Sequence, residues 1–113
     1  MKLLEIRTYR LHPNAGQAFV AAFQQALPLL RQSGMDVVAF GRSEHEHESF
    51  YLIRAFADQA QLTADQDAFY SSQVWKRGPR EAIVACIDSY LNTLLWLSDE
   101  GVEDMRQSNG LLI

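Results

Sequence analysis

Hydrophobic and polar residues alternate along several stretches of the chain, a pattern typical of β-strands whose two faces meet different surroundings. The alternation predicts four strands, over Leu3–Leu11, Val37–Ser43, Phe50–Phe56 and Ile87–Leu97. Successive side chains of a strand point to opposite faces, so every second residue shares a face. On the first strand this groups Glu5, Arg7 and Tyr9, and on the third it groups Phe50, Leu52, Arg54 and Phe56.

After the first strand the apolar residues change to a helical spacing. Four of them recur at intervals of four, four and three positions and form one stripe along a helix: Phe19, Phe23, Leu27 and Leu30. We expect Asn14 to cap this helix at its start and Gly34 to follow its last turn. Pro28 removes one backbone hydrogen bond, so it is expected to kink the helix.

The segment between the third and fourth strands predicts a second, less regular helical region. It runs from Gln59 to about Lys76, and Asp58 is expected to cap it. Pro79 then suits the first position of a short helix that ends at Cys86. The expected buried positions of the longer region are Leu62, Phe69 and Val74.

The resulting order β-α-β-β-α-β indicates an α+β, ferredoxin-like domain with a four-stranded antiparallel sheet. Two helices can cover only one face of that sheet. We place Tyr9, Leu52 and Phe56 on the other face, with large residues of the last strand. A monomer rarely exposes such a large apolar surface, so two sheets are expected to pair into a dimeric α/β barrel. Alternatively, the second helix or the tail covers this face within one chain.

The chain divides into one domain and a short tail. Residues 1–97 form the ferredoxin-like domain, and residues 98–113 form a C-terminal tail. The last three residues, Leu111, Leu112 and Ile113, are too apolar for a free tail, so the tail is expected to dock on its own or the partner subunit. The expected assembly is a homodimer or a higher homo-oligomer.

Charge and cysteine content narrow the range of partners. The net charge is −4 and no basic stripe occurs, which argues against nucleic acids and anionic membranes as partners. Cys86 is the only cysteine, so an internal disulfide is excluded and a reducing compartment fits. The first residues are too charged for a signal peptide, and no apolar run approaches the ~18 residues of a membrane span. We therefore expect a cytoplasmic protein.

The polar residues of the first strand are the main candidates for chemistry. Glu5, Arg7 and Tyr9 point the same way and are expected to lie near Arg54 in a poorly solvated environment. A buried charge needs a partner, which Glu5 offers to either arginine. Either this ion pair only fixes sheet register or dimer geometry, or Arg7 or Arg54 binds an anionic or carbonyl ligand beside the Tyr9 hydroxyl.

An aromatic segment adds two further candidates. Tyr70 and Trp75 are either core and interface residues or an apolar lid over the pocket. The candidate pocket residues are therefore Glu5, Arg7, Tyr9, Arg54, Phe56, Tyr70 and Trp75.

Metal and cofactor chemistry have little support in the sequence. His45 and His47 lie in a Glu-rich hairpin without an identifiable third ligand, so we interpret them as solvated and predict no metal. Cys86 has apolar neighbours and is interpreted as a buried thiol. No cofactor-binding motif occurs, and we predict no cofactor.

Several segments together resemble the NIPSNAP family, which lies within the dimeric α/β-barrel superfamily. The resemblance spans about Leu3 to Leu97. Its segments are residues 5–11 followed by Pro13, the pair Gly34-Met35, the alternation of Phe50–Phe56, and the stretch from Asp67 through Trp75 to Ile83.

This resemblance implies sheet-to-sheet pairing and a small-ligand cleft between sheet and helices. The superfamily includes cofactor-independent monooxygenases, isomerases, lactone-handling enzymes and haem-degrading proteins. The haem-degrading members carry a histidine on a helix near the pocket, and this chain has no convincing counterpart of that residue. The family offers no agreed catalytic residues to carry over. We therefore expect a homodimer that binds a small hydrophobic molecule with an aromatic or carbonyl group. The alternative is a cofactor-independent monooxygenase or isomerase acting on a small aromatic or lactone substrate.

Overall fold

Four strands form one antiparallel sheet. The computed structural model describes residues 1–45 and 48–112, so Glu46, His47 and Ile113, which belong to the expected hairpin and tail, lie outside the described residues. The sheet order is β2-β3-β1-β4, with every pairing antiparallel. This confirms the predicted ferredoxin-like α+β fold. The strands are β1 (Lys2–Leu11), β2 (Asp36–Arg42), β3 (Ser49–Phe56) and β4 (Ile87–Leu97).

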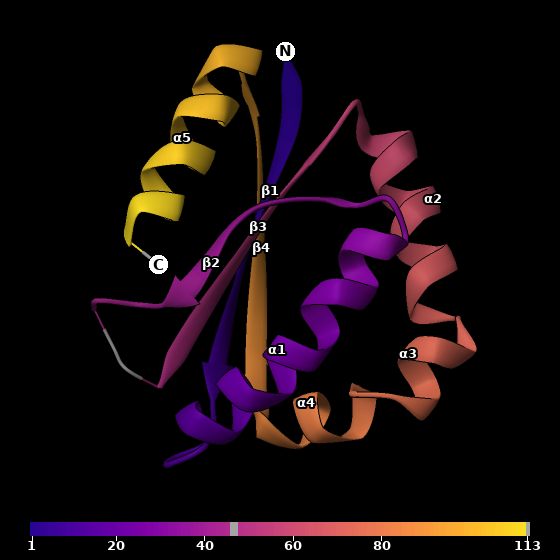
Figure 1. Cartoon of the computed structure of the whole chain (residues 1–113), viewed down its shortest axis with the longest axis vertical. Coiled ribbons are helices and arrows are strands. Elements are labelled where there is room, and N and C mark those ends of the chain that lie inside the picture. The colour runs from indigo at the N-terminus through magenta and orange to yellow at the C-terminus, as the bar shows by residue number, and fades with distance from the viewer. Residues whose placement is uncertain (46–47, 113) are drawn as a thin grey trace.

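Helices lie on both sides of the sheet and make three layers. Figure 1 shows α1 to α4 on one side, which we name the front face, and α5 on the other side, the back face. The expected tail is thus largely helical and packs against its own chain. The helices are α1 (Gly16–Gln32), α2 (Gln59–Tyr70), α3 (Gln73–Arg77), α4 (Arg80–Cys86) and α5 (Asp99–Leu112).

The prediction for α1 is correct at the C-terminal end of the helix and wrong at its N-terminal end. Gly34 follows the helix with a φ of 94°, and its N–H donates to the Arg31 carbonyl at 3.0 Å, as predicted. The prediction that Asn14 caps the start is wrong, because Ala15 is the N-cap residue and makes no side-chain bond. A carboxylate from a distant segment takes this role: Glu48 Oε2 accepts from the Gly16 N–H at 3.1 Å.

The second helical region begins at the predicted capping residue, but one of its expected buried residues is exposed. Asp58 Oδ1 accepts from the Gln61 N–H at 2.8 Å, which confirms the predicted cap. The prediction that Val74 is buried is wrong, since its side chain is 60% exposed. Neighbouring residues of a helix point about 100° apart. Trp75 takes the inward position of the short helix α3, and Val74 is therefore turned outward.

The prediction for the two sheet faces is wrong in one respect. Tyr9, Leu52 and Phe56 do share a face, but this is the front face, where they belong to the same buried cluster as Phe19 and Phe23 of α1. The alternation of a strand determines which residues lie together, whereas the path of the connecting helices determines which face is covered. Glu5 and Arg7 of β1 therefore point toward the helices.

The back face is covered only in part. Leu4, Ala39 and Ala55 pack there with Val102 of α5. Arg106 of α5 donates hydrogen bonds of 2.7 and 3.0 Å to the two carboxylate oxygens of Asp36, which lies at the start of β2. Two large apolar residues of the edge strand β4, Leu91 and Leu95, remain exposed on the back face. Three more are exposed on its front face: Tyr90, Leu94 and Trp96.

Candidate functional site

A cavity of about 400 Å³ lies between the front face of the sheet and helices α1 to α4. Its polar lining comes mainly from Arg7, Tyr9, Gln66, Tyr70 and Tyr90, while Asp67 and Arg80 add exposed charges at its rim. Most of the remaining wall is apolar, including Phe19, Phe23, Leu30, Leu52, Trp75 and Ile83.

An ion pair beneath the cavity is fully buried. Glu5 and Arg54 are both 0% exposed, and Arg54 Nε and Nη2 donate to Glu5 Oε1 at 3.0 and 2.6 Å. Arg54 Nη1 donates to Tyr70 Oη at 3.0 Å and contacts Met35 Sδ at 3.7 Å. Most Arg54 N–H groups are thus engaged within the protein, and neither partner lines the cavity. The pair forms the fixed base of the site.

Arg7 lies above this pair, lines the cavity and is held differently. Its Nε donates to Asn92 Oδ1 at 2.8 Å. Its terminal nitrogens make only long contacts: Nη2 to Glu5 Oε2 at 3.5 Å and to Gln66 Oε1 at 3.4 Å, and Nη1 to Tyr70 Oη at 3.5 Å. Such distances exceed the usual range of N–H···O bonds. The terminal guanidinium nitrogens of Arg7 are therefore the loosely held donors of the site.

Gln66 of α2 connects the helix to the charged strand. Its Nε2 donates to Glu5 Oε2 at 2.8 Å, and its Oε1 accepts the long contact from Arg7. Glu5 thus accepts from Arg54 through one oxygen and from Gln66 and Arg7 through the other. No buried side-chain nitrogen or oxygen among residues 1–45 and 48–112 lacks a hydrogen-bond partner.

Tyr70 of α2 joins the two arginines. A guanidinium can only donate, so Tyr70 Oη accepts from Arg7 and from Arg54. Its own O–H remains to donate to a third group, and it forms no hydrogen bond to an acceptor within the described part of the chain. Because Tyr70 lines the cavity, this O–H is a hydrogen-bond donor available at the cavity wall.

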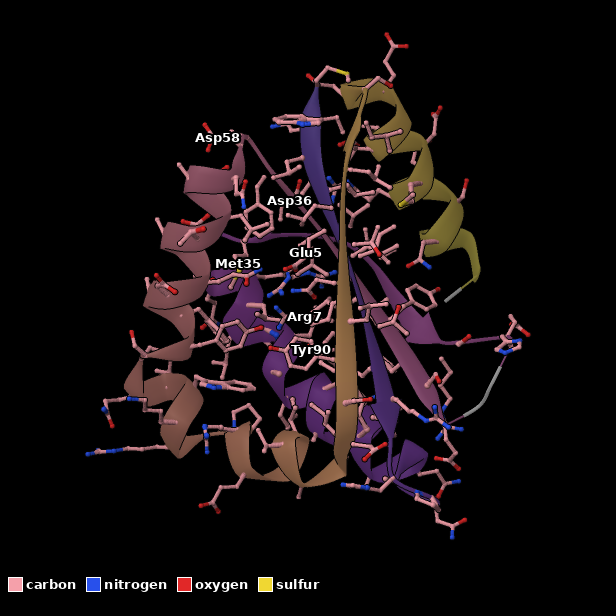
Figure 2. All side chains as sticks on the ribbon, turned by 180° about the vertical axis from the view of Figure 1, so that it is seen from behind. Glu5, Arg7, Met35, Asp36, Asp58 and Tyr90 are labelled. Atoms are coloured by element: carbon pink, nitrogen blue, oxygen red, sulfur yellow. The ribbon has the colours of Figure 1, made fainter. Side chains whose placement is uncertain are left out.

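Two further tyrosines flank Arg7 from the sheet side. The Tyr90 ring centroid lies 4.8 Å from Arg7 Cζ, a cation–π distance, and Figure 2 shows Glu5, Arg7 and Tyr90 one below another on the front side of the sheet. Burial raises the pKa of the Tyr9 hydroxyl to about 12, although the nearby guanidinium groups oppose this shift. Tyr9 is therefore neutral at pH 7 and supplies no negative charge.

Most of the predicted pocket residues lie together. Glu5, Arg7, Arg54 and Tyr70 form one hydrogen-bonded network, and Tyr9 lines the cavity. Trp75 lines it too, with its ring 5.3 Å from that of Tyr70 and nearly perpendicular to it, and is only 8% exposed. Phe56 is a core residue opposite Leu3 and is not among the cavity-lining residues.

The sequence interpretation missed three contributors: Gln66, Asn92 and Tyr90. Gln66 precedes Tyr70 by four residues, so helical spacing places both on one side of α2. Asn92 and Tyr90 pair directly with Arg7 and Tyr9 in the sheet. To identify Asn92 and Tyr90 as contributors, one must know the register between β1 and β4, which the alternation of residues alone does not give.

Metal binding, a reactive cysteine and a membrane span have little structural basis in the described residues. Within residues 1–45 and 48–112, no three His, Cys, Asp or Glu side chains gather as a metal site would require. Burial raises the pKa of the Cys86 thiol, which disfavours the reactive thiolate. Within residues 1–45 and 48–112, every helix is too short or too polar to span a lipid bilayer.

Fold and cavity together define a class: a ferredoxin-like α+β domain with a ligand-sized space between its sheet and its helices. The NIPSNAP family model matches residues 4–98. The chain therefore belongs to the NIPSNAP family. Among curated proteins, none matches it.

Solved structures of similar fold include further members of this family. An uncharacterized NIPSNAP domain protein from Burkholderia xenovorans has a TM-score of 0.76 at 18% identity, covering 86% of this chain and 95% of that one. A NIPSNAP family protein from Agrobacterium tumefaciens has a TM-score of 0.79 at 13% identity, covering 88% and 95%. A Bordetella bronchiseptica protein, provisionally named an antibiotic biosynthesis monooxygenase, has a TM-score of 0.69 at 20% identity, covering 86% and 97%. At these identities the likeness shows the fold alone.

Proposed function

We propose that this protein is a homodimer that binds a small hydrophobic molecule, with an aromatic or carbonyl group, between its sheet and its helices. The observation that carries this proposal is the cavity of about 400 Å³, whose apolar walls surround the Arg7 guanidinium and the Tyr70 hydroxyl. Small-molecule sites commonly occupy about 300–1,000 Å³, with mostly apolar walls and a few polar groups that orient the ligand.

The apolar walls and the polar base have separate roles in this proposal. Phe19, Leu52 and Trp75 exclude water from the body of the ligand, which favours a flat hydrophobic molecule. Arg7 and Tyr70 donate to an oxygen atom of the ligand and fix its orientation. The Glu5–Arg54 pair keeps both donors in place because it contacts each of them.

The exposed strand β4 supports the homodimer. Leu91 is 71% exposed and Trp96 53% exposed, on opposite faces of an edge strand whose outer side has no strand neighbour. An edge strand offers unpaired backbone groups to another chain, and large exposed apolar patches mark sites of protein–protein contact. Because Tyr90 belongs both to β4 and to the cavity wall, a second copy at this edge would lie beside the ligand.

Sedimentation equilibrium tests the assembly. We expect a mass near twice the 12.8 kDa of one chain at micromolar concentration. A mass near a single chain under these conditions would contradict the homodimer.

A second candidate function is a cofactor-independent monooxygenase or isomerase acting on a small aromatic or lactone substrate. The observation favouring it is the Tyr70 hydroxyl, which two guanidinium groups hold beside the cavity with its proton free to donate. In an isomerase, Arg7 would stabilise an enolate while Tyr70 relays the proton. In a monooxygenase, molecular oxygen would oxidise a bound phenol to a quinone. One oxygen atom becomes the new carbonyl oxygen, and the other leaves as water with the two hydrogen atoms that the phenol loses.

A thermal-shift panel of phenols, quinones and lactones tests ligand binding. A molecule that binds the folded state raises the midpoint of unfolding by mass action. We expect hits with the wild-type protein that disappear in Arg7→Gln. Tyr51→Phe serves as the control, because Tyr51 lies on the back face, where Asn109 Nδ2 donates to its hydroxyl. A panel without hits, or hits that Arg7→Gln leaves unchanged, would refute the proposed site.

Product analysis of each hit separates the two candidate functions. Incubation in air followed by mass spectrometry detects an oxidised or isomerised product. Turnover that Tyr70→Phe abolishes while binding persists favours the enzyme. Binding without turnover favours a protein whose role is to bind the ligand.

A further inference from the structure

We propose that the cavity selects a ligand carrying one negative charge on an acidic oxygen group, such as a carboxylate, and that Arg7 is its receptor. This inference rests on the proposed ligand-binding function and specifies the chemical class of the ligand. Three observations carry it: the charge balance of the site, the unequal way in which its two arginines are held, and the donors that point at the same place.

The buried site carries one positive charge more than it can neutralise. Glu5 supplies one negative charge, and Arg7 and Arg54 supply one positive charge each. The rim residues Asp67 and Arg80 are opposite in sign and leave this balance unchanged. The excess is notable in a chain whose net charge is −4. Removing a charge from water is costly unless an opposite charge accompanies it, so an anion is the favoured occupant.

The geometry assigns the excess charge to Arg7. Arg54 contacts Glu5 at 2.6 and 3.0 Å and does not line the cavity, so these two charges neutralise each other. The contact between Arg7 and Glu5 is 3.5 Å long, and Glu5 is already bonded to Arg54 and Gln66. A ligand oxygen at the terminal nitrogens of Arg7 would replace long contacts by short charge-assisted bonds.

The neighbouring aromatic groups favour an anion over a second cation or a neutral group. The Tyr70 O–H can donate to the same ligand oxygen as Arg7, because Tyr70 Oη is itself in contact with Arg7 Nη1 at 3.5 Å. Tyr9 remains neutral at physiological pH, so it cannot serve as an internal counter-charge. The Tyr90 ring lies against the Arg7 guanidinium and leaves the guanidinium edge available for in-plane hydrogen bonds.

Matched pairs of an acid and its neutral amide test the charge requirement directly. We would measure dissociation constants by calorimetry at pH 7.5 for benzoate and benzamide, 2-naphthoate and 2-naphthamide, and biphenyl-4-carboxylate and its carboxamide. Members of each pair have nearly the same shape, so their affinity ratio reports the charge. We expect the best-fitting acid to bind roughly tenfold to hundredfold more tightly than its amide, as one charge-assisted pair would give.

Two variants localise the preference to Arg7, and a third controls for charge. Arg7→Gln removes the receptor, and Asn92→Asp places a carboxylate where Asn92 Oδ1 now accepts from Arg7 Nε at 2.8 Å. Both are expected to reduce the acid-to-amide ratio to within about threefold. Ser89→Asp makes the same charge change on the same strand, but opposite the exposed Arg10 on the back face. It is expected to keep the wild-type ratio.

Each outcome decides the question, and circular dichroism verifies the fold of every variant. Acid and amide binding equally well to the wild type overturns the anion assignment while ligand binding itself stands. An acid preference that survives in both Arg7→Gln and Asn92→Asp overturns Arg7 as the receptor. If no pair binds, the inference fails. The proposed function then fails as well only if the phenols, quinones and lactones also do not bind. Because Asn92 is exposed, its variant remains informative if Arg7→Gln does not fold.

Discussion

Strands β1 and β4 are hydrogen-bonded neighbours, yet they invert the usual relation between polarity and burial. On β1, Glu5 is 0% exposed and Arg7 9%, although both are charged. On β4, the residue opposite Glu5 is Leu94, which is 42% exposed, and Leu91 is 71% exposed. Residues of the two strands pair directly from Lys2 and Leu97 to Arg10 and Ser89, and the contrast is clearest at the pair Glu5 and Leu94.

The difference follows from position in the sheet and from the partners available there. β1 lies between β3 and β4 and is covered by helices, so its charges are buried and must find partners within the chain. Arg54, Gln66 and Tyr70 provide them. β4 is an edge strand, and its apolar side chains lack cover from the chain itself. In the proposed function, the buried charges belong to the ligand site, and the exposed apolar residues belong to the surface between the two copies of the dimer.

The largest effect is expected from replacing a buried charge of β1 with an apolar residue. Glu5→Leu leaves Arg54 buried without its counter-charge, so the free energy of unfolding is expected to fall by about 3–5 kcal/mol. Urea unfolding monitored by circular dichroism measures this loss. Glu5→Leu with Arg54→Met removes both charges and is expected to recover part of it. Leu94→Gln, the opposite change at the paired position of β4, should cost less than about 1 kcal/mol. Equal costs at both positions would contradict the contrast.

On the exposed strand β4, an added charge is expected to weaken the dimer without unfolding the protein. Leu91→Asp would bury an unpaired carboxylate in the proposed dimer, so the dimer dissociation constant should rise roughly a hundredfold or more. Sedimentation across a concentration series measures it, and the far-ultraviolet spectrum should stay unchanged. Gln25→Glu, a charge added on the outer surface of α1, is the control and should leave the mass unaltered. A Leu91→Asp protein that sediments as the wild type does would place the interface elsewhere.

Tyr9 and Tyr90 are paired across the two strands but differ in burial, and alkaline pH tests this difference. Tyr9 is 7% exposed with a pKa of about 12, whereas Tyr90 opposite it is 58% exposed. A folded-state pKa above the unfolded value of about 10 means that the fold favours the neutral hydroxyl. Its contribution is complete below pH 10 and disappears as the pH rises to about 12. Between pH 9 and pH 11 the free energy of unfolding should fall by about 1 kcal/mol through this group.

Two conservative variants isolate that contribution. Tyr9→Phe should remove this part of the loss, and Tyr90→Phe should retain it, in urea titrations at both pH values. The same alkaline loss in Tyr9→Phe and the wild type would show that another group is responsible.

The smallest expected effect concerns the ion pair that joins α5 to β2 on the back face. Arg106 of α5 binds both oxygens of Asp36, and these side chains are 32% and 41% exposed. Partly exposed pairs contribute little, so Arg106→Gln should lower the free energy of unfolding by about 0.5–1 kcal/mol, less at high salt. Denaturant midpoints at low and high ionic strength measure it. A loss above about 2 kcal/mol would mean that α5 is a main support of the sheet.

The sequence alone determined the strands and part of the helix ends of this protein. Alternation gave the strands and grouped Glu5, Arg7 and Tyr9, because neighbouring residues of a strand must point to opposite faces. Short-range chemistry gave the cap at Asp58 and the glycine after α1. Arg54 was also identified, because a charge within an apolar strand pattern is visible without coordinates. Tyr70 was identified with Trp75 as part of an aromatic segment, whereas the role of its hydroxyl came from the structure.

Tertiary structure alone decided which face the helices cover, which arginine is saturated and where the cavity lies. Gln66 and Asn92 meet Arg7 from segments 59 and 85 positions away in the chain, and no local pattern encodes such contacts. The helical path of α5 along the back face likewise depends on its packing against β2. Alternation and capping involve residues a few positions apart, whereas burial and charge balance depend on the arrangement of the whole chain.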